Sequence, residues 1–196
     1  MKKGMGLTAV ALLLAGCGPV ELPVMHKYAL TMPVKTIKQA PKTNKTLVVA
    51  VSMAEPGYRS KGMVYTQTPY ELKQYSQSRW VAPPSKMLGS MVVNALQQAH
   101  YFQAVTSPAV GSQPNYQLNV HLDSLQQSFL KSSSYVHLAV TVTLIDVKSS
   151  RVIAARTYVK EVTAPENNAY AGVVAANQAA EWVATRVADF ARQFGR

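Results

Sequence analysis

The chain has 196 residues, enough for one domain whose hydrophobic core needs neither disulfide bonds nor a structural metal. Apolar residues make up 48% and charged residues 15%, the proportions of an ordinary globular protein, which excludes a fibrous or largely disordered chain. The formal net charge of +11 suits a partner with an anionic surface, such as phospholipid heads, lipopolysaccharide or nucleic acid, although a solvated surface with a basic bias explains it equally well.

Residues 1–16 have the features of a secretory signal peptide. The positive stretch Met1–Lys3 precedes the apolar run Gly6–Ala15, which is about half as long as a helix needs to be to cross a bilayer. The run ends in Leu14-Ala15-Gly16-Cys17, which resembles the lipobox of bacterial lipoproteins, where the thiol takes a diacylglycerol before cleavage. The sequence therefore predicts a lipoprotein signal peptide and no transmembrane anchor.

Cys17 is the only cysteine of the chain, so it has no disulfide partner and no second thiol with which to bind a metal. Acylation with diacylglycerol and a fatty acid such as palmitate would hold the mature chain on a membrane essentially permanently, since each buried methylene contributes about 0.8 kcal/mol. Gly18 follows in place of aspartate, and by the usual sorting rule of such lipoproteins this predicts the periplasmic face of the outer membrane. A buried cysteine after an ordinary signal peptide is the alternative.

Residues 17–46 are predicted to form the lipidated N-terminus and a tether. Prolines interrupt this stretch, and its second half carries lysines without intervening acids: Lys35, Lys38, Lys42 and Lys45. As a flexible chain, the 29 residues after Cys17 would reach about 30 Å. The lysines either lie against lipid phosphates, each contributing about 1 kcal/mol near an anionic surface, or belong to a solvated linker.

The folded domain is predicted over residues 47–196 and begins with a buried strand. Leu47–Val51 is a continuous apolar run typical of a strand covered on both faces, and the turn at Pro56-Gly57 ends it. A second strand is expected at Met63–Gln67, followed by a short helix or irregular segment at Tyr70–Tyr75. Aromatic and basic residues of this region could form a nucleic-acid face, but tyrosines at the rim of a core or at a partner surface explain them better.

The segment Arg79–Val105 is the most regular part of the chain. Two adjacent prolines cannot lie inside a helix or a central strand, but the second fits a first helical turn, so a helix begins near Pro84 or Ser85. Its apolar residues recur with a helical period and need a sheet to cover them: Leu88, Met91, Val92, Ala95, Leu96 and Ala99. The alternation over Phe102–Val105 then predicts a strand.

The remainder of the chain predicts strands and then one long helix. Tyr116–Leu122 alternates between apolar and polar residues, Val136–Ile145 is apolar enough on both faces for a central strand, and Val152–Val162 returns as its antiparallel partner. The last helix carries an apolar stripe from Val173 to Phe194, which either packs on the domain's own sheet or forms a coiled-coil homo-oligomer. Together the elements predict a single α/β domain, with a mixed sheet of five to six strands and two main packed helices.

No catalytic constellation, cofactor site or metal site is evident in the sequence. None of the four histidines has helical metal-ligand spacing to another, and no cysteine joins them. His121 and His137 would come together only if their strands pair, which leaves an unrecognised enzyme site as one alternative. The glycines form no phosphate-binding loop and no serine lies in a nucleophile elbow, so the sequence predicts a non-enzymatic protein without cofactors.

Six residues between positions 79 and 105 carry a family resemblance: Arg79, Trp80, Pro83, Pro84, Phe102 and Val105. Together with Tyr28-Ala29-Leu30 and Leu47–Val51 they resemble the PqiC-like family of ABC-type transport auxiliary lipoproteins, over roughly residues 28–194. The resemblance implies that Tyr28–Leu30 forms an edge strand docked on the domain. It also implies that the six residues, called the family motif below, either support the fold or bind a partner.

The same resemblance implies an auxiliary role in an MCE-linked system that moves lipids between the inner and outer membranes. A permease and a cytoplasmic ATPase would supply the work, an MCE-domain protein would span the gap, and this chain would dock its far end while held by the diacylglycerol on Cys17. Phospholipid binding by the domain and homo-oligomerisation stay open, and nucleic acid is not an expected partner. A structural lipoprotein of another envelope complex, for secretion or lipopolysaccharide export, is the alternative function.

Overall fold

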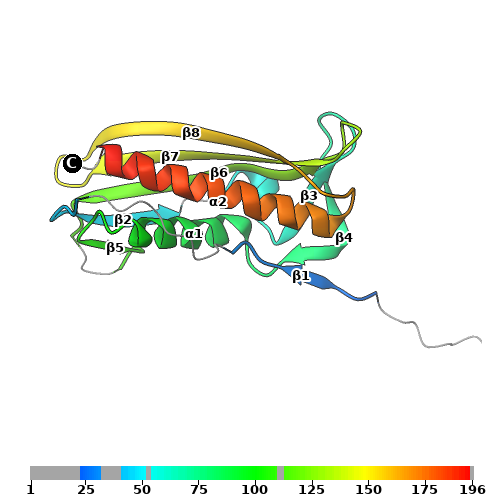
Figure 1. The fold of residues 1–196 in the computed structure, drawn as a ribbon, viewed down its shortest axis with the longest axis horizontal. Coiled ribbons are helices and arrows are strands. Elements are labelled where there is room, and N and C mark those ends of the chain that lie inside the picture. The colour runs from blue at the N-terminus through cyan, green and yellow to red at the C-terminus, as the bar shows by residue number, and fades with distance from the viewer. Residues whose placement is uncertain (1–22, 32–40, 52–53, 110–112, 195–196) are drawn as a thin grey trace, which may run out of the picture.

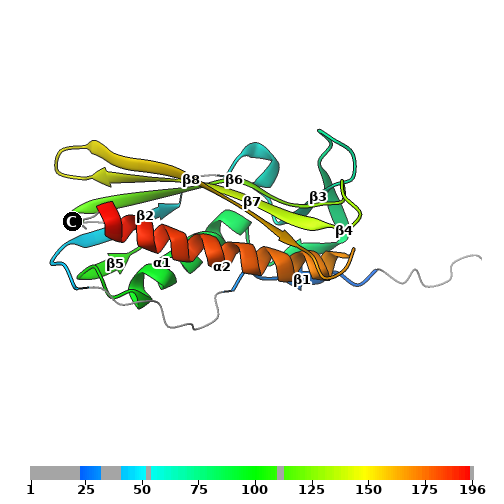
Figure 2. The same ribbon diagram turned by 45° about the horizontal axis from the view of Figure 1, so that its top comes forward.

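The computed structural model describes residues 23–31, 41–51, 54–109 and 113–194. Within these ranges it contains one mixed sheet of eight strands, with both helices packed on the same face (Figure 1, Figure 2). The single α/β domain with two main helices is therefore confirmed, and the sheet has more strands than the five to six expected.

The three longest strands form one side of the sheet, with β8 at its edge: β6 (Tyr116–Ser128), β7 (Tyr135–Asp146) and β8 (Arg151–Thr163). They run antiparallel in the order β6-β7-β8; the pairing of β7 with β8 is as predicted, and the pairing of β6 with β7 is one that the sequence left open. Two strands share the other edge of β6, because its 13 residues leave room for one at each end. β2 (Thr46–Val51) pairs in parallel with the first residues of β6, and β3 (Gly62–Thr66) pairs in parallel with the last.

These two partners extend the sheet in separate groups. At one end, β2 also pairs with the short β5 (Ala104–Thr106). At the other end, β3 pairs with β4 (Lys73–Trp80), and β4 pairs with the edge strand β1 (His26–Tyr28). The family resemblance implies an edge strand over Tyr28–Leu30; the strand lies two residues earlier and shares only Tyr28 with that segment. We call the end with β1, β3 and β4 the proximal end, because the described chain starts there, and the end with β2 and β5 the distal end (Figure 1).

Two predicted segments differ from the structure. The segment Tyr70–Tyr75, expected to be a short helix or irregular, instead enters strand β4 at Lys73. Most residues of β4 are polar, and of its eight residues only Ser78 and Trp80 are buried, so no apolar alternation is visible in the sequence. The strand forms because β1 and β3 pair with its two edges and satisfy its backbone. β5 begins two residues later than predicted, since Phe102 turns into the core.

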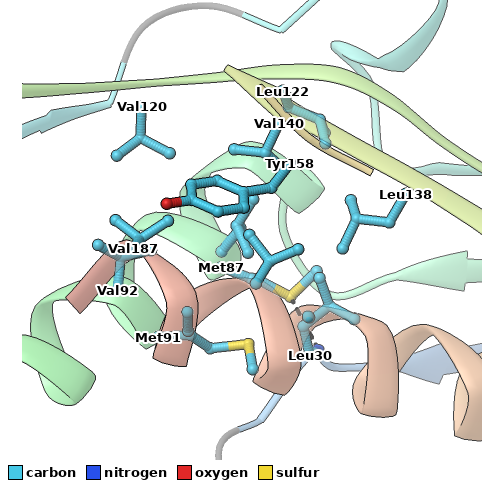
Figure 3. Close-up of a cluster of buried hydrophobic side chains, with 14 of the residues drawn as sticks. Leu30, Met87, Met91, Val92, Val120, Leu122, Leu138, Val140, Tyr158 and Val187 are labelled. Atoms are coloured by element: carbon cyan, nitrogen blue, oxygen red, sulfur yellow. Dashed lines mark hydrogen bonds between the residues drawn. The ribbon is translucent and has the colours of Figure 1, made fainter. Parts of the chain in front are cut away.

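Both helices follow the predicted pattern. α1 (Pro84–Gln98) begins at the second of the paired prolines, and α2 (Ala169–Phe194) is the long C-terminal helix. The apolar stripe of α2 packs against β7, β8 and α1 inside the domain, so it is not available as a coiled-coil seam. Figure 3 shows where the layers meet, with side chains from both helices and from the sheet in one cluster: Met87, Met91, Val92, Val120, Leu122, Leu138, Val140, Tyr158 and Val187.

A buried polar network joins the start of α2 to the sheet at the proximal end. The Gln127 side chain, 4% exposed, accepts a hydrogen bond from the Tyr75 hydroxyl (2.9 Å) and donates to Ser134 Oγ (2.9 Å) and to the carbonyl oxygen of Asn168 (3.1 Å). Ser134 is fully buried, and its backbone N–H donates to Asn167 Oδ1 at 2.8 Å. A satisfied buried network permits only one arrangement of its neighbours, so these contacts determine where α2 begins.

This network predicts a pH dependence of stability. Burial, with a smaller contribution from Tyr65, raises the pKa of Tyr75 from 10.0 to about 12. The folded state therefore holds this proton more tightly than the unfolded chain does, so the stabilisation is complete below pH 10 and is lost as the pH rises toward 12. We expect the difference in unfolding free energy between wild type and Tyr75→Phe to shrink across this window. Urea unfolding on both sides of it is the measurement, and a constant difference would contradict the expectation.

Candidate functional site

The family motif lies at the two ends of α1, with Arg79, Trp80, Pro83 and Pro84 before the helix and Phe102 and Val105 after it. A helix of 15 residues is about 22 Å long, so the two halves of the motif do not form a single cluster. Trp80, Phe102 and Val105 are buried, whereas the Arg79 side chain is exposed. Each half therefore has its own set of neighbours.

The first half of the motif holds the N-terminal segment. β1 pairs in parallel with the end of β4, so that Lys27 lies opposite Arg79 and Tyr28 lies opposite Trp80. Beyond the strand, the N–H of Val81 donates to the carbonyl oxygen of Tyr28 at 2.8 Å. The residues that precede the two prolines therefore bind the N-terminal segment through backbone hydrogen bonds.

Residues 29–31 are fixed by both helices. Leu30 is 6% exposed, and its N–H lies 3.4 Å from the sulfur of Met87 in α1 (Figure 3). Asn177 of α2 uses both ends of its amide, because Nδ2 donates to the carbonyl oxygen of Ala29 at 3.1 Å and Oδ1 accepts from the N–H of Thr31 at 2.7 Å. We call β1, residues 29–31 and these contacts the N-terminal latch.

The second half of the motif lies where residues 43–47 contact the domain again. The N–H of Thr43 donates to the carbonyl oxygen of Tyr101 at 2.7 Å, and Leu47 of β2 pairs with Val105 of β5. The motif thus fixes the chain on both sides of residues 32–42. Both halves of the motif therefore lie beside points where the N-terminal chain is bound to the domain.

The predicted tether is partly absorbed into the fold. Residues 26–31 and 43–46 contact the domain through the latch and through β2. The predicted anchor Cys17 and sorting residue Gly18 lie outside the described residues, as do Lys35 and Lys38. Lys42 lies within them and is exposed.

Replacing Asn177 with alanine is expected to loosen residues 29–31 without unfolding the sheet. The carbonyl oxygen of Ala29 and the N–H of Thr31 would each lose a partner, at a cost of about 1 kcal/mol per hydrogen bond. We expect the Thr31 amide to exchange with solvent about tenfold faster, while amides of β6 and β7 keep their protection. Gln178→Ala is the matched control, because Gln178 is exposed on the same helix. Equal exchange at Thr31 in both variants would show that Asn177 does not hold the segment.

The two histidines of the alternative enzyme site are not brought together. Their strands do pair, but His121 lies opposite Thr141, four residues along β7 from His137, which corresponds to about 13 Å. His121 contacts Glu55 at 3.2 Å and His137 contacts Glu161 at 3.3 Å, so each forms its own partly exposed pair. Among the described residues, no group of three His, Cys, Asp or Glu side chains could hold a metal ion.

The aromatic residues between positions 58 and 80 do not form one exposed surface. Tyr58 and Trp80 are buried, and the rings of Tyr65 and Tyr75 pack on each other with centroids 4.5 Å apart. Tyr70 alone among these five is fully exposed, on the β3–β4 loop. A stacking platform for nucleic acid needs several exposed rings in succession, so these tyrosines mainly rim the core.

Cationic side chains gather around Trp182 of α2, a cluster that the sequence analysis missed. Lys160 Nζ of β8 and Arg186 Cζ of α2 each lie 5.4 Å from the Trp182 ring centroid. Arg156 of β8 lies 5.8 Å from the ring of Phe190. Arg156 and Lys160 are four residues apart on one face of β8, and Trp182 and Arg186 are four apart on α2, but they become a cluster only because β8 and α2 pack together. We call Arg156, Lys160, Arg186 and Trp182 the cationic cluster.

The cavity beneath the first turns of α2 is too small for a lipid. It lies among Met63, Trp80, Leu125 and Val136 and holds about 10 Å³, the space of one water molecule. Neither helix in the described part of the chain has a stretch apolar and long enough to cross a bilayer. This cavity is therefore not a binding site for a lipid.

Known proteins share both the sequence pattern and the fold. The family model of the ABC-type transport auxiliary lipoprotein component matches residues 28–188, from the latch to the last turns of α2. Among solved structures, the chain is similar to a Xanthomonas campestris protein of family DUF330, with 22% identity and a TM-score of 0.78 over 86% of this chain and 95% of that one. An uncharacterized protein is 16% identical, with a TM-score of 0.67 over 85% of this chain and 98% of its own.

A third solved structure, a hypothetical protein from Chlamydia trachomatis, is 6% identical, with a TM-score of 0.54 over 78% of this chain and 98% of that one. These three likenesses show a shared fold. A search of curated proteins found no match. The family match includes both halves of the motif and the latch from Tyr28 onward. The chain therefore belongs to the family of ABC-type transport auxiliary lipoprotein components.

Proposed function

We propose that this protein is the lipid-anchored, non-enzymatic auxiliary component of an MCE-linked ABC system that moves lipids between the inner and outer membranes. The observation that supports this most directly is the N-terminal latch, which fastens the chain arriving from Cys17 to β4, α1 and α2. A domain that works from a lipid anchor needs such a latch, because every residue released from the fold lengthens the tether.

The latch limits how far the domain can move from its anchor. Acylated Cys17 would hold the protein on the periplasmic face of the outer membrane, the location that Gly18 predicts. Eight residues lie between Cys17 and His26, where the latch begins, and an extended chain between these two positions spans about 30 Å. We infer that the proposed MCE-domain partner reaches across the periplasm to meet the domain close to this membrane.

Docking, and not lipid carriage, is the role that we propose for the domain itself. The cavity beneath α2 has room for one water molecule and none for an acyl chain, so this cavity is not where the domain would carry a lipid. The cationic cluster offers the exposed Arg156 and Arg186 beside a half-buried tryptophan, and arginine and tryptophan are enriched in protein interfaces. A permease and an ATPase at the inner membrane would supply the work.

Co-purification tests this proposal. The full-length protein, extracted with detergent, should recover an MCE-domain protein together with a permease and an ATPase, and Cys17→Ala should move the protein out of the membrane fraction. Arg186→Glu reverses one charge of the cationic cluster and should lower the recovery. Lys86→Glu is the matched control, since Lys86 is an exposed lysine on α1. Recovery of unrelated envelope proteins alone would overturn the proposal.

A further inference from the structure

We propose that the proximal end of the domain rests on the bilayer and inserts apolar side chains of two loops into its interface. The side chains are Tyr70 and Leu72 of the β3–β4 loop and Leu130 of the β6–β7 loop. The occupant is a phospholipid surface, namely that of the membrane in which Cys17 is anchored. The inference rests on the proposed function in one respect, the acylation of Cys17.

Large apolar side chains are exposed in both loops. Tyr70 is 106% exposed, Leu72 49% and Leu130 46%. Tyr70 also has a φ of 69°, in the left-handed region that a tyrosine rarely adopts, so the loop presents this ring to solvent despite a backbone cost. Tyrosine beside leucine is the combination found where proteins meet the interface of a bilayer.

The two loops are held side by side by the sheet. β3 and β6 run parallel with Thr66 opposite Ser128, so the two strands end side by side at the proximal end of the sheet. The N–H of Phe129 donates to the carbonyl oxygen of Thr66 at 2.9 Å, and the Phe129 ring meets the Tyr65 ring edge-on with centroids 6.1 Å apart. Figure 1 and Figure 2 show both loops at one end of the long axis of the molecule.

The N-terminal chain leaves the fold at this same end. β1 is parallel to β4, and β4 starts at Lys73, directly after the loop. Traced backward from His26, the chain leaves the fold at the same end of the long axis as the two loops and away from α1, with the start of β1 on the lower side of that end and the loops on its upper side in Figure 1. Five residues lie between Cys17 and Pro23, the first described residue, so these two positions are at most about 20 Å apart. An acylated Cys17 thus brings the proximal end to the bilayer.

The charges beside the loops are paired, so the contact is apolar in character. Lys73 lies 3.1 Å from Glu71, and Lys131 lies 3.5 Å from Glu161. Paired charges add little attraction to anionic lipid heads, and we expect the contact to change little with salt. The cationic cluster lies on β8 and α2 away from these loops, where it is free to meet a protein partner.

The test places a fluorophore at each end of the full-length, acylated protein in vesicles of phosphatidylethanolamine and phosphatidylglycerol. Since Cys17 is the only cysteine and is acylated, Leu72→Cys supplies one thiol for an environment-sensitive label, and Leu130→Cys repeats the measurement on the second loop. Lys148→Cys, in the exposed turn between β7 and β8 at the distal end, is the matched control. We expect blue-shifted emission and quenching by brominated lipid at positions 72 and 130, and neither at 148.

The outcomes separate this inference from the proposed function. Protein that floats with the vesicles while both loop labels report water would overturn the inference and leave the anchor intact. Quenching at position 148 alone would also overturn it, because the distal end would then face the bilayer. Protein that fails to float would overturn the anchor and the inference together.

Discussion

Trp80→Ala is expected to lower the free energy of unfolding by about 3–5 kcal/mol, the usual cost of removing a large aromatic side chain from a core. Trp80 is 4% exposed and lines the small cavity beneath α2 with Leu125 and Val136, so its removal would enlarge an existing gap. It also ends the strand that holds β1. Because domains of this kind are stable by about 5–15 kcal/mol in total, urea unfolding should show a large shift of the midpoint.

Arg79→Ala is the matched control for this prediction. Arg79 precedes Trp80 in β4, and its side chain is exposed, so we expect its stability to change by no more than about 0.5 kcal/mol. Comparison of the Trp80 and Arg79 variants also distinguishes the two roles that the family resemblance allows for the motif, support of the fold and binding of a partner. Reduced recovery of the MCE-domain protein by Arg79→Ala at unchanged stability would assign Arg79 to partner binding. Equal destabilisation by both variants would contradict the burial argument.

Gly172→Ala is expected to destabilise the domain by about 2–4 kcal/mol, although alanine is the better helix former. A Cβ at this position would come within 2.0 Å of Gln127 Oε1. Gln127 cannot simply move aside, because its amide bonds Tyr75, Ser134 and the Asn168 carbonyl oxygen. Relief of the clash therefore breaks buried hydrogen bonds that hold the start of α2.

Gly89→Ala is the control, because it places the same group on the other helix. Its Cβ would lie 2.1 Å from Val51 Cγ2, but Val51 is 38% exposed at the end of β2 and can rotate toward solvent. The gain in helix propensity, about 1 kcal/mol, should then balance the adjustment. We expect urea midpoints near wild type for Gly89→Ala and well below it for Gly172→Ala. Similar midpoints for the two variants would show that the Gln127 side chain can move aside without loss of stability.

Elements with a strong local pattern could be predicted from the sequence. The paired prolines place the start of α1 at Pro84, and the apolar stripe of α2 places that helix on the sheet, since both signals depend only on residues a few positions apart. β4 lacks such a signal. Its residues are mostly polar, and its strand conformation comes from pairing with β1 and β3, which no local pattern contains.

The candidate site shows the same division. The motif residues are recognisable in sequence, but their role as the seat of the N-terminal chain appears only once β1 lies against β4. Asn177 was not singled out, although a polar side chain four residues after Val173 does interrupt the apolar stripe of α2. Its partner Thr31 is 146 residues away, so nothing nearby in the chain indicates what the amide binds.

By itself, the amino-acid order determined the α/β class, the two helices and the membership of an auxiliary lipoprotein family, because hydrophobic period, proline position and motif spacing are local properties. It also predicts the acylated Cys17, which lies outside the described residues. Only the tertiary structure decided which residues grip the N-terminal chain, which loops share an end with it and where the cations gather. Those features depend on pairs such as Thr31 with Asn177, and their contact exists only after the sheet and helices have closed around the core.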